Sequence, residues 1–393
     1  MHNAFSNRLN KELNPIPDGS PLVVDLFAGC GGLGLGFEAN GFATVGFEVE
    51  AAYCATYRRN LHGECHQLRL TSDSVLPPAK VVIGGPPCQP FSVGGLQMGL
   101  GDARDGFPTF ISAIRRLQPE LWLFENVRGM LYSNRPYFEE IITALKALNY
   151  IVEYRLLNAV NYGVPQNRER IVVIGHRGEF RWPDPEKKKV TVAEALGEMM
   201  SQIPPESKFL TASMDVYVAK YEKASFCIRP RDLHPDAPAR TLTCRNLAGA
   251  TGDMHRIRLS DGRRRRLLLR EAARLQTFPD WFMFEGNEAD RFNQIGNAVA
   301  PLFALHLAKS VREYLNSSIR FKSGEIAYRN LPDQLALPLV MNESEPSRIP
   351  ELLKSPDKKA AVGRVINEAL YVLSRLGVPL DGISDRNRAL TGC

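Results

Sequence analysis

The chain has few cysteines, and their placement argues against two kinds of site. Seven cysteines stand among 393 residues, at positions 30, 54, 65, 88, 227, 244 and 393. Their number is odd, and they lack the paired spacing of zinc ligands, as do the seven scattered histidines. We therefore expect neither a disulfide framework nor a bound metal, and a reducing, cytoplasmic setting for the protein.

Long apolar runs are also missing. No stretch approaches the roughly 20 residues that a membrane-spanning helix needs, and residues 1–6 lack the basic and apolar segments of a signal peptide. The hydrophobic fraction of 44% and the charged fraction of 23% are ordinary for a globular protein. A chain of this length can bury a large core, so we expect two domains without membrane contact.

Lysine is absent between Arg229 and Arg274, where arginine is abundant. This segment holds 12 arginines, four aspartates and one glutamate, a net charge of +7 against +6 for the whole chain. Such a basic stripe is the expected footprint of a nucleic-acid backbone. For the run 263–266 taken alone, a solvated helix face is an equally good interpretation.

The first part of the chain predicts a βαβ unit. Residues 22–27 and 43–47 are short apolar runs that indicate buried strands, and helical segments are expected up to Asn40 and over residues 50–60. Gly41 marks the end of the first helix. The alternation predicts an α/β fold with a parallel sheet and right-handed crossovers.

The loop after the first strand is rich in glycine. Gly29, Gly31 and Gly34 have the spacing of the dinucleotide-binding fingerprint, and Glu48 follows the second strand. Glycines let the backbone approach a ligand, and a carboxylate can bind ribose hydroxyls. Such loops serve both nicotinamide dinucleotides and S-adenosylmethionine; a tight turn without a ligand is the plainer alternative.

A cysteine stands on a proline-braced loop. Residues 81–83 predict a buried strand, taken as the third of the chain, and Gly-Gly-Pro-Pro-Cys-Gln-Pro-Phe-Ser follows at residues 84–92. The two prolines before Cys88 fix their φ angles, so neither strand nor helix can continue there. Ligands of open α/β sheets bind at this edge. A lone buried cysteine in a turn is the alternative.

Two more charged motifs adjoin predicted strands. Glu125, followed by Asn-Val, comes after the strand 121–124, and Gln-Asn-Arg-Glu-Arg at 166–170 precedes the strand 171–175. Alone, the glutamate is more often a helix N-terminal residue, and the arginines a charged strand edge.

Together these motifs resemble those of the cytosine-5 DNA methyltransferases. The resemblance rests on Asp-Leu-Phe-Ala-Gly-Cys-Gly-Gly at 25–32, the Pro-Pro-Cys loop, Glu125-Asn-Val, Gln-x-Arg-x-Arg, residues 266–279 and Gln-Ile-Gly-Asn-Ala-Val at 294–299. The six motifs keep their order over residues 22–315. The resemblance implies a Rossmann-like catalytic domain that uses S-adenosylmethionine to methylate double-stranded DNA.

The resemblance also implies catalytic roles. Cys88 would attack carbon 6 of a flipped-out cytosine, because the ring must become electron-rich before carbon 5 can take a methyl group. Glu125 would bind ring nitrogen 3 and the amine, Arg170 would contact the ring oxygen, and Arg168 would orient its neighbours. A mobile loop over 93–106 would close behind the base.

Further residues are assigned to the site by the same resemblance. Glu48 would hold the ribose hydroxyls, and Phe107 would pack on the adenine. The implied cofactor contacts are Asp25, Phe27, Gly29, Cys30, Gly31, Gly32, Leu33, Glu48, Val49, Gln67, Leu68, Gly85, Pro87, Phe107, Asn297 and Ala298. The implied DNA contacts are Ser92, Gln97, Arg104, Arg240, Arg245, Arg256 and Arg258.

Three positions depart from the family pattern. Gln67 or Leu68 stands where an acid usually accepts from the adenine amine, Lys80 replaces a carboxylate, and Val49 replaces an aromatic residue. These changes bear on cofactor affinity more than on the chemistry.

The expected domains follow from the motifs. Residues 1–20 predict a flexible arm, 21–180 with 286–317 the catalytic domain, 181–285 a smaller mixed target-recognition domain, and 318–393 an extension with a helix over 360–376. We expect a monomer, associated with the nucleoid, that works beside a cognate restriction endonuclease.

Four other functions stay open at this point. A tRNA cytosine methyltransferase shares the fold but tends to have a shorter recognition region. A nicotinamide dehydrogenase explains only the glycine fingerprint. A silent DNA-binding relative does not need both Cys88 and Glu125, and an amino methyltransferase would have Asn/Asp-Pro-Pro-aromatic in place of Pro-Pro-Cys.

Overall fold

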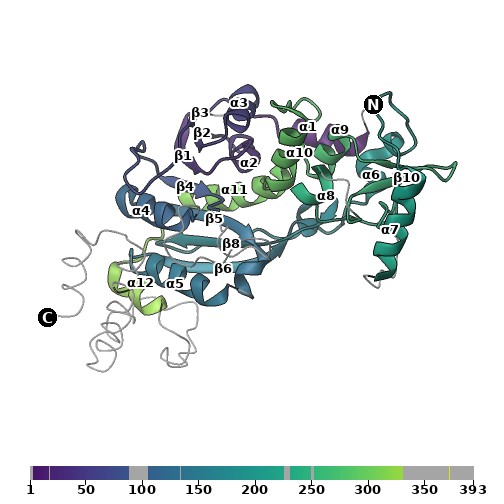
Figure 1. Cartoon of the computed structure of the whole chain (residues 1–393). Coiled ribbons are helices and arrows are strands. Elements are labelled where there is room, and N and C mark those ends of the chain that lie inside the picture. Colours follow the sequence, from purple (N-terminus) through teal and green to yellow (C-terminus); the bar gives the residue numbers. More distant parts are fainter. Residues whose placement is uncertain are drawn as a thin grey trace. The chain divides into compact units, whose positions relative to one another are not determined.

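The computed structural model describes residues 3–16, 18–87, 105–132, 134–224, 231–248, 252–330 and 371 (Figure 1). The chain divides into two compact units. Unit 1 comprises residues 1–69, 157–170 and 182–310, and unit 2 comprises residues 70–156, 171–181 and 311–393. Among the described residues, no helix is both long enough and apolar enough to cross a membrane.

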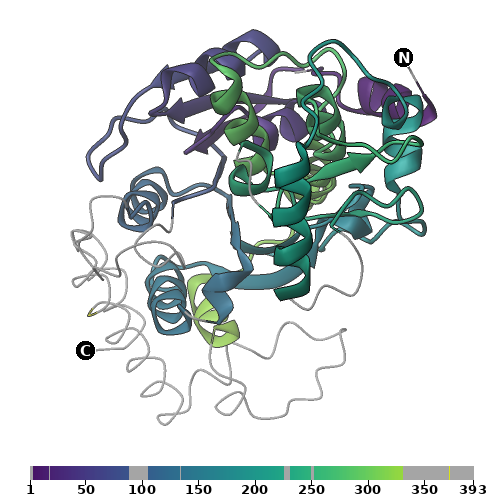
Figure 2. The same ribbon diagram turned by 45° about the vertical axis from the view of Figure 1, so that its right-hand side comes forward.

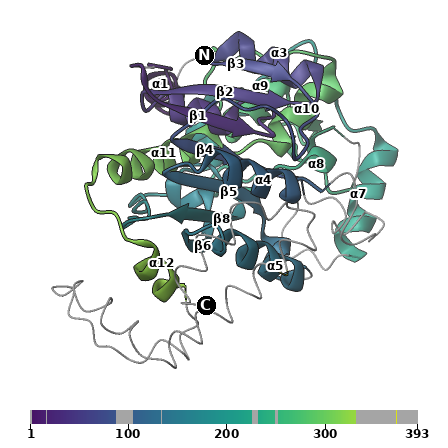
Figure 3. The same ribbon diagram turned by 90° about the vertical axis from the view of Figure 1, so that its left-hand side faces the viewer.

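Unit 1 contains the predicted βαβ arrangement. Strands β1 (Ser20–Leu26), β2 (Phe42–Glu48) and β3 (Glu64–Gln67) pair in parallel in the order β3-β2-β1, connected by helices α2 (Gly32–Glu38) and α3 (Ala51–Asn60) (Figure 3). The register sets Asp25 opposite Gly46 and Glu48 opposite Gln67. The α/β fold and the parallel strands expected from the sequence are confirmed, and the loops after β1 and β2 leave the same edge.

Strand β3 corrects the predicted strand count. The Cys88 loop follows the fourth strand of the chain, because β3 lies between β2 and the apolar strand at 81–84. In β3 only Cys65 is buried, and the other three side chains are exposed. A short polar strand of this kind has no apolar run to identify it.

Helix α1 (Ala4–Glu12) corrects the prediction of a flexible arm over residues 1–20. The Asn3 side chain accepts from Ser6 N at 2.8 Å, and Ser6 Oγ accepts from Asn3 N at 2.9 Å, which closes a capping box. Asn3 also donates to the carbonyls of Glu194 and Ala195. Phe5 and Leu9 are buried, so the helix belongs to the core of unit 1.

Short elements make up the rest of unit 1. They are β7 (Gln166–Asn167), α6 (Val192–Leu196), α7 (Ala212–Ala224), β9 (Ala239–Arg240), α8 (Cys244–Ala248), β10 (Arg256–Arg258), β11 (Arg264–Arg266), α9 (Leu269–Leu275), α10 (Glu288–Asn297) and most of α11 (Pro301–Asn316), with 3-10 turns at Ala159–Tyr162 and Gly197–Met200. Helix α7 lies beside the β10–β11 hairpin (Figures 1 and 2). Gly36 allows α2 to pack closely on α11, because an added Cβ would lie 2.5 Å from Ala304 Cβ.

Unit 2 holds the other strands. β4 (Val81–Gly84) and β5 (Leu121–Val127) pair in parallel, and the order continues with β8 (Glu169–His176) and β6 (Ile151–Asn158), whose ends nearest 157–170 count with unit 1. The helices are α4 (Phe107–Leu117), α5 (Arg135–Lys146) and α12 (Ser323–Arg329), with a 3-10 turn at Arg128–Leu131. Trp122, Phe124 and Phe110 form a fully buried aromatic core.

The predicted domain boundaries differ from this division, since β1–β3 fall in one unit with residues 182–310. These boundaries remain a prediction. The helix expected over 360–376 lies outside the described residues except for Tyr371.

Candidate functional site

The glycine loop after β1 bends sharply through left-handed backbone conformations. Phe27, Gly29 and Gly31 have φ values of 58°, 57° and 89°. A positive φ is strained for phenylalanine, and strain of this kind concentrates at ligand sites. An added Cβ at Gly29 would meet no atom within 4 Å, so the loop borders open space there. The side chain of Phe27 is half-buried beside it.

Glu48 closes the loop from the end of β2. Its Oε2 accepts from Gly29 N at 2.8 Å, and its Oε1 accepts from Glu50 N at 2.9 Å. Burial raises the pKa of Glu48, although these backbone donors work in the opposite direction. Each carboxylate oxygen has a further lone pair, so the group can accept from two hydroxyls of a ligand while it holds the loop.

Asp25 lies beneath the same loop, at the end of β1. It is 1% exposed, and its Oδ2 is buried without a hydrogen-bond partner. Burial raises the pKa of Asp25 well above its usual value, and the nearby charge of Glu48 raises it further. A buried carboxyl oxygen without a partner is costly in a folded protein. This atom is therefore a candidate contact for a polar ligand.

Exposed apolar side chains flank Glu48. Val49 is 39% exposed and Leu68 is 40% exposed, and Leu68 N donates to Glu48 O at 2.8 Å. Gln67 is exposed next to Leu68. Val49 thus follows Glu48 in the chain, and Gln67 and Leu68 stand beside Glu48 on the neighbouring strand. Lys80 instead pairs with Glu120 in unit 2, at 3.2 Å.

Helix α10 supports the other side of the glycine loop. A Cβ at Gly32 would lie only 2.4 Å from Val299 O, so only glycine fits here. Cys30 is buried, with its thiol 3.8 Å from Gln294 O, and burial raises its pKa to about 12. Leu33 is buried in α2, whereas Asn297 is exposed and Ala298 is half-buried. Cys30 and Leu33 therefore serve packing here, and Asn297 and Ala298 keep exposed surface.

In unit 2 the proline-braced loop is fixed to the strand that carries Glu125. The register pairs Gly84 with Phe124, so the residues after each strand emerge side by side. Asn126 Nδ2 donates to Pro86 O at 2.9 Å, and Val127 N donates to Asn126 Oδ1 at 2.8 Å. Glu125 is buried at 8% exposure. The amide of Asn126 is thus a brace between the two predicted catalytic motifs.

The cysteine itself lies outside the described residues, as do Ser92, Gln97, Arg104 and the loop predicted to be mobile up to Arg104. The residues on either side of the segment 88–104 are joined, because Gly106 N donates to Pro87 O at 3.1 Å. Gly85 borders open space, and Gly85 and Pro87 are half-buried. Both ends of the segment therefore start from one point beside β4.

The structure corrects the prediction for Phe107. Its ring is fully buried and packs edge-on against Phe124, with ring centroids 5.2 Å apart, and against Tyr137 at 6.1 Å. It exposes no surface to a cofactor adenine, because α4 places it on the helix face that packs into the core of unit 2.

The two arginines of the Gln-x-Arg-x-Arg motif differ. Arg168 is 1% exposed and donates to the carbonyls of Leu242, Gly296 and Ala298 at 2.7, 3.1 and 3.0 Å. It thus joins its own segment to Leu242 and to residues 296–298, which are far away in the sequence, in keeping with an orienting role. Arg170 is half-buried and donates to the carbonyl of Glu169.

The arginine stripe folds into a hairpin with one carboxylate at its centre. In the β10–β11 pairing, Arg256 faces Arg266 and Arg258 faces Arg264, which would repel without compensation. Asp232, 5% exposed, accepts from Arg256 Nε at 2.8 Å and from Arg258 Nε at 3.1 Å. Behind the hairpin, Arg265 and Glu271 form a fully buried bidentate pair.

These pairs correct part of the basic-stripe prediction. Arg256 is 0% exposed and is held by both Asp232 and Glu222, so it is a scaffold residue and not a DNA contact. Arg258 is 53% exposed and Arg245 is exposed on α8. Arg240 is 40% exposed and pairs with Asp253. Of the four predicted arginines of this region, three therefore reach the surface.

Sequence reasoning missed the acidic partners of the stripe. Asp232 and Asp253 are ordinary acids in a loop-rich segment, and Asp232 lies 24 residues from Arg256. The available signal was that the segment 229–274 holds only five acids against 12 arginines, because a buried arginine needs a carboxylate partner.

Comparison with known proteins agrees with the motifs. The family model described as C-5 cytosine-specific DNA methylase matches residues 22–313. The chain is 54% identical over 321 residues to the type II methyltransferase M.AplI of Arthrospira platensis, covering 81% of this chain and 92% of that protein. It is 34% identical over 322 residues to the type II methyltransferase M1.HphI of Haemophilus parahaemolyticus, covering 73% and 86%.

A solved structure shares the fold. It is that of a DNA modification methyltransferase encoded within a prophage of E. coli, with a TM-score of 0.57 and 23% sequence identity. The match covers 76% of this chain and 100% of that chain.

Proposed function

The chain belongs to the C-5 cytosine-specific DNA methylase family, and on this basis we propose how its residues methylate carbon 5 of cytosine in duplex DNA. The observation that carries the proposal is the hydrogen bond from Asn126 to the Pro86 carbonyl. It fixes the loop that leads to Cys88 beside the strand that ends with Glu125. The residues that lead to Cys88 and the Glu125 carboxyl group thus leave the same edge of β4 and β5.

We propose that the glycine loop after β1, Asp25 and Glu48 together form a cradle in unit 1 that binds S-adenosylmethionine. When bound, this cofactor supplies an electrophilic methyl group. We infer that Glu48 accepts from its ribose hydroxyls while it holds Gly29, and that Asp25 Oδ2 gains the partner it lacks. The exposed Val49 and Leu68 provide apolar contact surface beside the ribose site. Gln67 offers a neutral carbonyl to the adenine amine, a weaker acceptor than a carboxylate.

The protein residues act on the cytosine ring in three ways. Cys88 adds through its thiolate to carbon 6, and the electron pair of the double bond moves toward carbon 5. Glu125 binds ring nitrogen 3 and the amine and stabilises the charge that develops on the ring. Arg170 contacts the ring oxygen. Once carbon 5 has taken a methyl group, removal of its proton returns an electron pair to the ring, and the bond to Cys88 breaks with release of the thiolate.

The cytosine must leave the duplex before Cys88 can reach carbon 6. Flipping costs a few kcal/mol, which contacts to the flipped base and to the DNA backbone must offset. We propose that Arg245 and Arg258, both exposed, make part of the backbone contacts. Because two relatives are named type II methyltransferases, we further infer a cognate restriction endonuclease that cuts the same sequence.

A trapping experiment tests the covalent step. After carbon 5 has taken a methyl group, a fluorine there cannot be removed as a proton, so in the presence of S-adenosylmethionine duplex DNA with 5-fluorocytosine at the target should hold the enzyme as a stable adduct. We expect an adduct that survives denaturation and maps by peptide mass spectrometry to Cys88. Cys88→Ser should form none, whereas Cys393→Ser should form as much as the wild type. An adduct on another residue would contradict the assignment of Cys88.

A further inference from the structure

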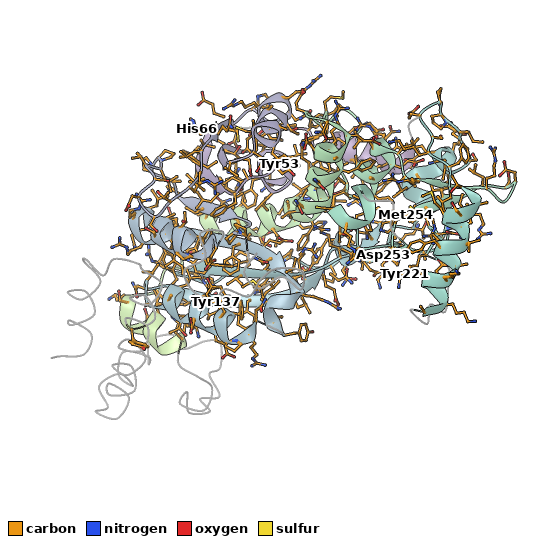
Figure 4. The ribbon with its side chains drawn as sticks, viewed as in Figure 1. Tyr53, His66, Tyr137, Tyr221, Asp253 and Met254 are labelled. Atoms are coloured by element: carbon orange, nitrogen blue, oxygen red, sulfur yellow. The ribbon has the colours of Figure 1, made fainter. Side chains whose placement is uncertain are left out.

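One charged cluster of the recognition region has no role in the chemistry above. It consists of Arg231, Arg240 and Asp253, with the ring of Tyr221 beside it; Figure 4 labels Tyr221 and Asp253 close together. Both guanidinium groups donate through Nη1 to the same carboxylate oxygen, Asp253 Oδ1. Arg240 Nη2 also donates to the backbone carbonyl of Asp253 at 3.2 Å. Asp253 therefore accepts hydrogen bonds from two nitrogens of Arg240.

The cluster is closely packed on its inner side. The Arg231 guanidinium lies over the Tyr221 ring, 4.9 Å from the centroid, and a Cβ at Gly252 would lie 2.5 Å from Tyr221 Cγ. The side chains of Arg231 and Asp253 are 21% and 25% exposed. Arg231 and Tyr221 thus hold the Asp253 carboxylate in place, and the carboxylate in turn fixes the more exposed Arg240.

Arg240 also occupies a distinctive place in the fold. In the parallel pair of β7 and β9, Arg240 stands opposite Asn167, next to Arg168. Thr241 Oγ1 donates to the Asn167 carbonyl, and Leu242 N donates to Gln166 Oε1 at 3.0 Å. The arginine is thus one strand away from the motif proposed to contact the flipped cytosine. Base pairs next to the target are the part of the DNA that this position would meet.

We propose that Asp253 is a specificity-determining positioning residue, which fixes the Arg240 guanidinium for recognition of a guanine in a base pair near the target cytosine. This inference rests on the proposed function. An arginine that binds guanine O6 and N7 together needs a fixed planar fork, and the carboxylate of Asp253 removes the rotational freedom of that fork. Free arginine side chains lose more rotamer entropy on binding.

Asp232 provides the contrast within the same region. It also serves more than one arginine, but it is 5% exposed and its partner Arg256 is 0% exposed. Asp232 joins the buried Arg256 to the exposed Arg258 with one Nε hydrogen bond each, whereas Asp253 holds the 40% exposed Arg240 at two nitrogens. Arg240 keeps its Nε–H and further Nη protons for a base edge after its two hydrogen bonds to Asp253.

The test is the sequence preference of the enzyme on a pool of duplex DNA with randomised sequence, with methylcytosine read at base resolution. Asp253→Ala should reduce the preference for guanine at one position near the target by about tenfold, with other positions unchanged. At saturating concentrations of the best duplex, kcat should stay within about twofold of wild type, since the chemistry is untouched. Arg240→Lys should relax the same position, because it keeps the charge and loses the fork.

Controls separate this role from a structural one. Asp261→Ala removes an exposed carboxylate that pairs with Arg263 in the same region and should leave the preference unchanged. Should Asp253→Ala fail to fold, the isosteric Asp253→Asn serves the same purpose. The double variant Asp253→Ala/Arg240→Lys should relax the preference at the affected position no further than the single variants do, because the two residues act as one unit.

Two outcomes would overturn the inference. One is a uniform loss of activity in Asp253→Ala and Asp253→Asn with an unchanged sequence preference. The other is relaxed preference in Arg240→Lys but not in the Asp253 variants. If wild-type enzyme methylates no duplex DNA at all, the proposed function fails, and this result is distinct from both.

Discussion

The glycine-loop cradle and the arginine-rich region (residues 229–274) differ in the partners of their buried ionisable groups. In the cradle, Asp25 and Glu48 are buried carboxyl groups whose described partners are backbone N–H groups, and burial raises the pKa of both. In the arginine-rich region, buried Arg256 and Arg265 each meet carboxylates directly. We interpret the buried carboxyl groups, which have no counterion, as groups that await a ligand. The buried arginines, which have carboxylate counterions, complete the scaffold.

The role of the buried ion pairs in the scaffold can be tested first. Arg265→Met leaves Glu271 buried without its counterion and should lower the free energy of unfolding by about 3–5 kcal/mol. Urea denaturation followed by circular dichroism measures this change. The double variant Arg265→Met/Glu271→Leu should recover most of the loss, because it removes both charges. An equally large loss in the double variant would show that the ion pair itself stabilises the region.

In the cradle, substitution of Glu48 should change the affinity for the cofactor. Glu48→Gln removes a charged acceptor and should raise the dissociation constant for S-adenosylmethionine by about tenfold, as the loss of a charge-assisted hydrogen bond does. Isothermal titration calorimetry measures this constant. Glu50→Gln, at the next acid along the chain, should bind like the wild type. Equal effects of the two substitutions would remove Glu48 from the ribose site.

The pH dependence of stability at Asp25 extends the comparison. Its pKa is raised in the folded protein, so its contribution to stability is present below the usual aspartate range and is lost as pH rises through the raised value. Glu186 has the opposite sign: although its burial alone would raise the pKa, His306 and Arg8 lower it to about 2, and that stability is lost only in acid.

Asp25→Asn should therefore stabilise the cofactor-free protein increasingly as pH rises. Urea midpoints of the variant and the wild type, measured from about pH 4 to about pH 8, should diverge steadily. Parallel curves would mean that Asp25 is ionised at little cost. Glu186→Gln provides the control, because its difference from wild type should shrink as pH falls.

The smallest effect concerns the exposed arginines. Arg258→Ala should weaken DNA binding on all sequences alike and reduce the slope of log affinity against log salt by about 1. Fluorescence anisotropy at several salt concentrations gives both quantities. Arg256→Ala should instead lower the melting temperature. A sequence-dependent effect of Arg258→Ala would place it among the base contacts.

The two regions also differ in what the sequence could predict. The strands and the glycine turn of the cradle could be predicted because their requirements are local: strand residues are apolar, and Gly29 and Gly31 adopt left-handed conformations within one turn. Strand β4 was found for the same reason. Strand β3 was missed because it buries only Cys65, and α1 was missed because its polar face and the nearby prolines concealed a capping box.

In the arginine-rich region, the buried arginines could not be predicted from local sequence. The burial of Arg256 depends on Asp232 and Glu222, which lie 24 and 34 residues away in the sequence. Likewise, the full burial of Phe107 depends on Phe124 and Tyr137. Composition predicts that the segment is basic, but it does not predict which of its arginines are buried in ion pairs inside the fold.

The most direct test of the account is methyl transfer from labelled S-adenosylmethionine to mixed-sequence duplex DNA and, in parallel, to tRNA. The enzyme should label DNA alone, the product should be 5-methylcytosine, and Cys88→Ala should abolish transfer while Cys393→Ala retains it. Label in tRNA alone, or undiminished transfer by Cys88→Ala, would contradict the account.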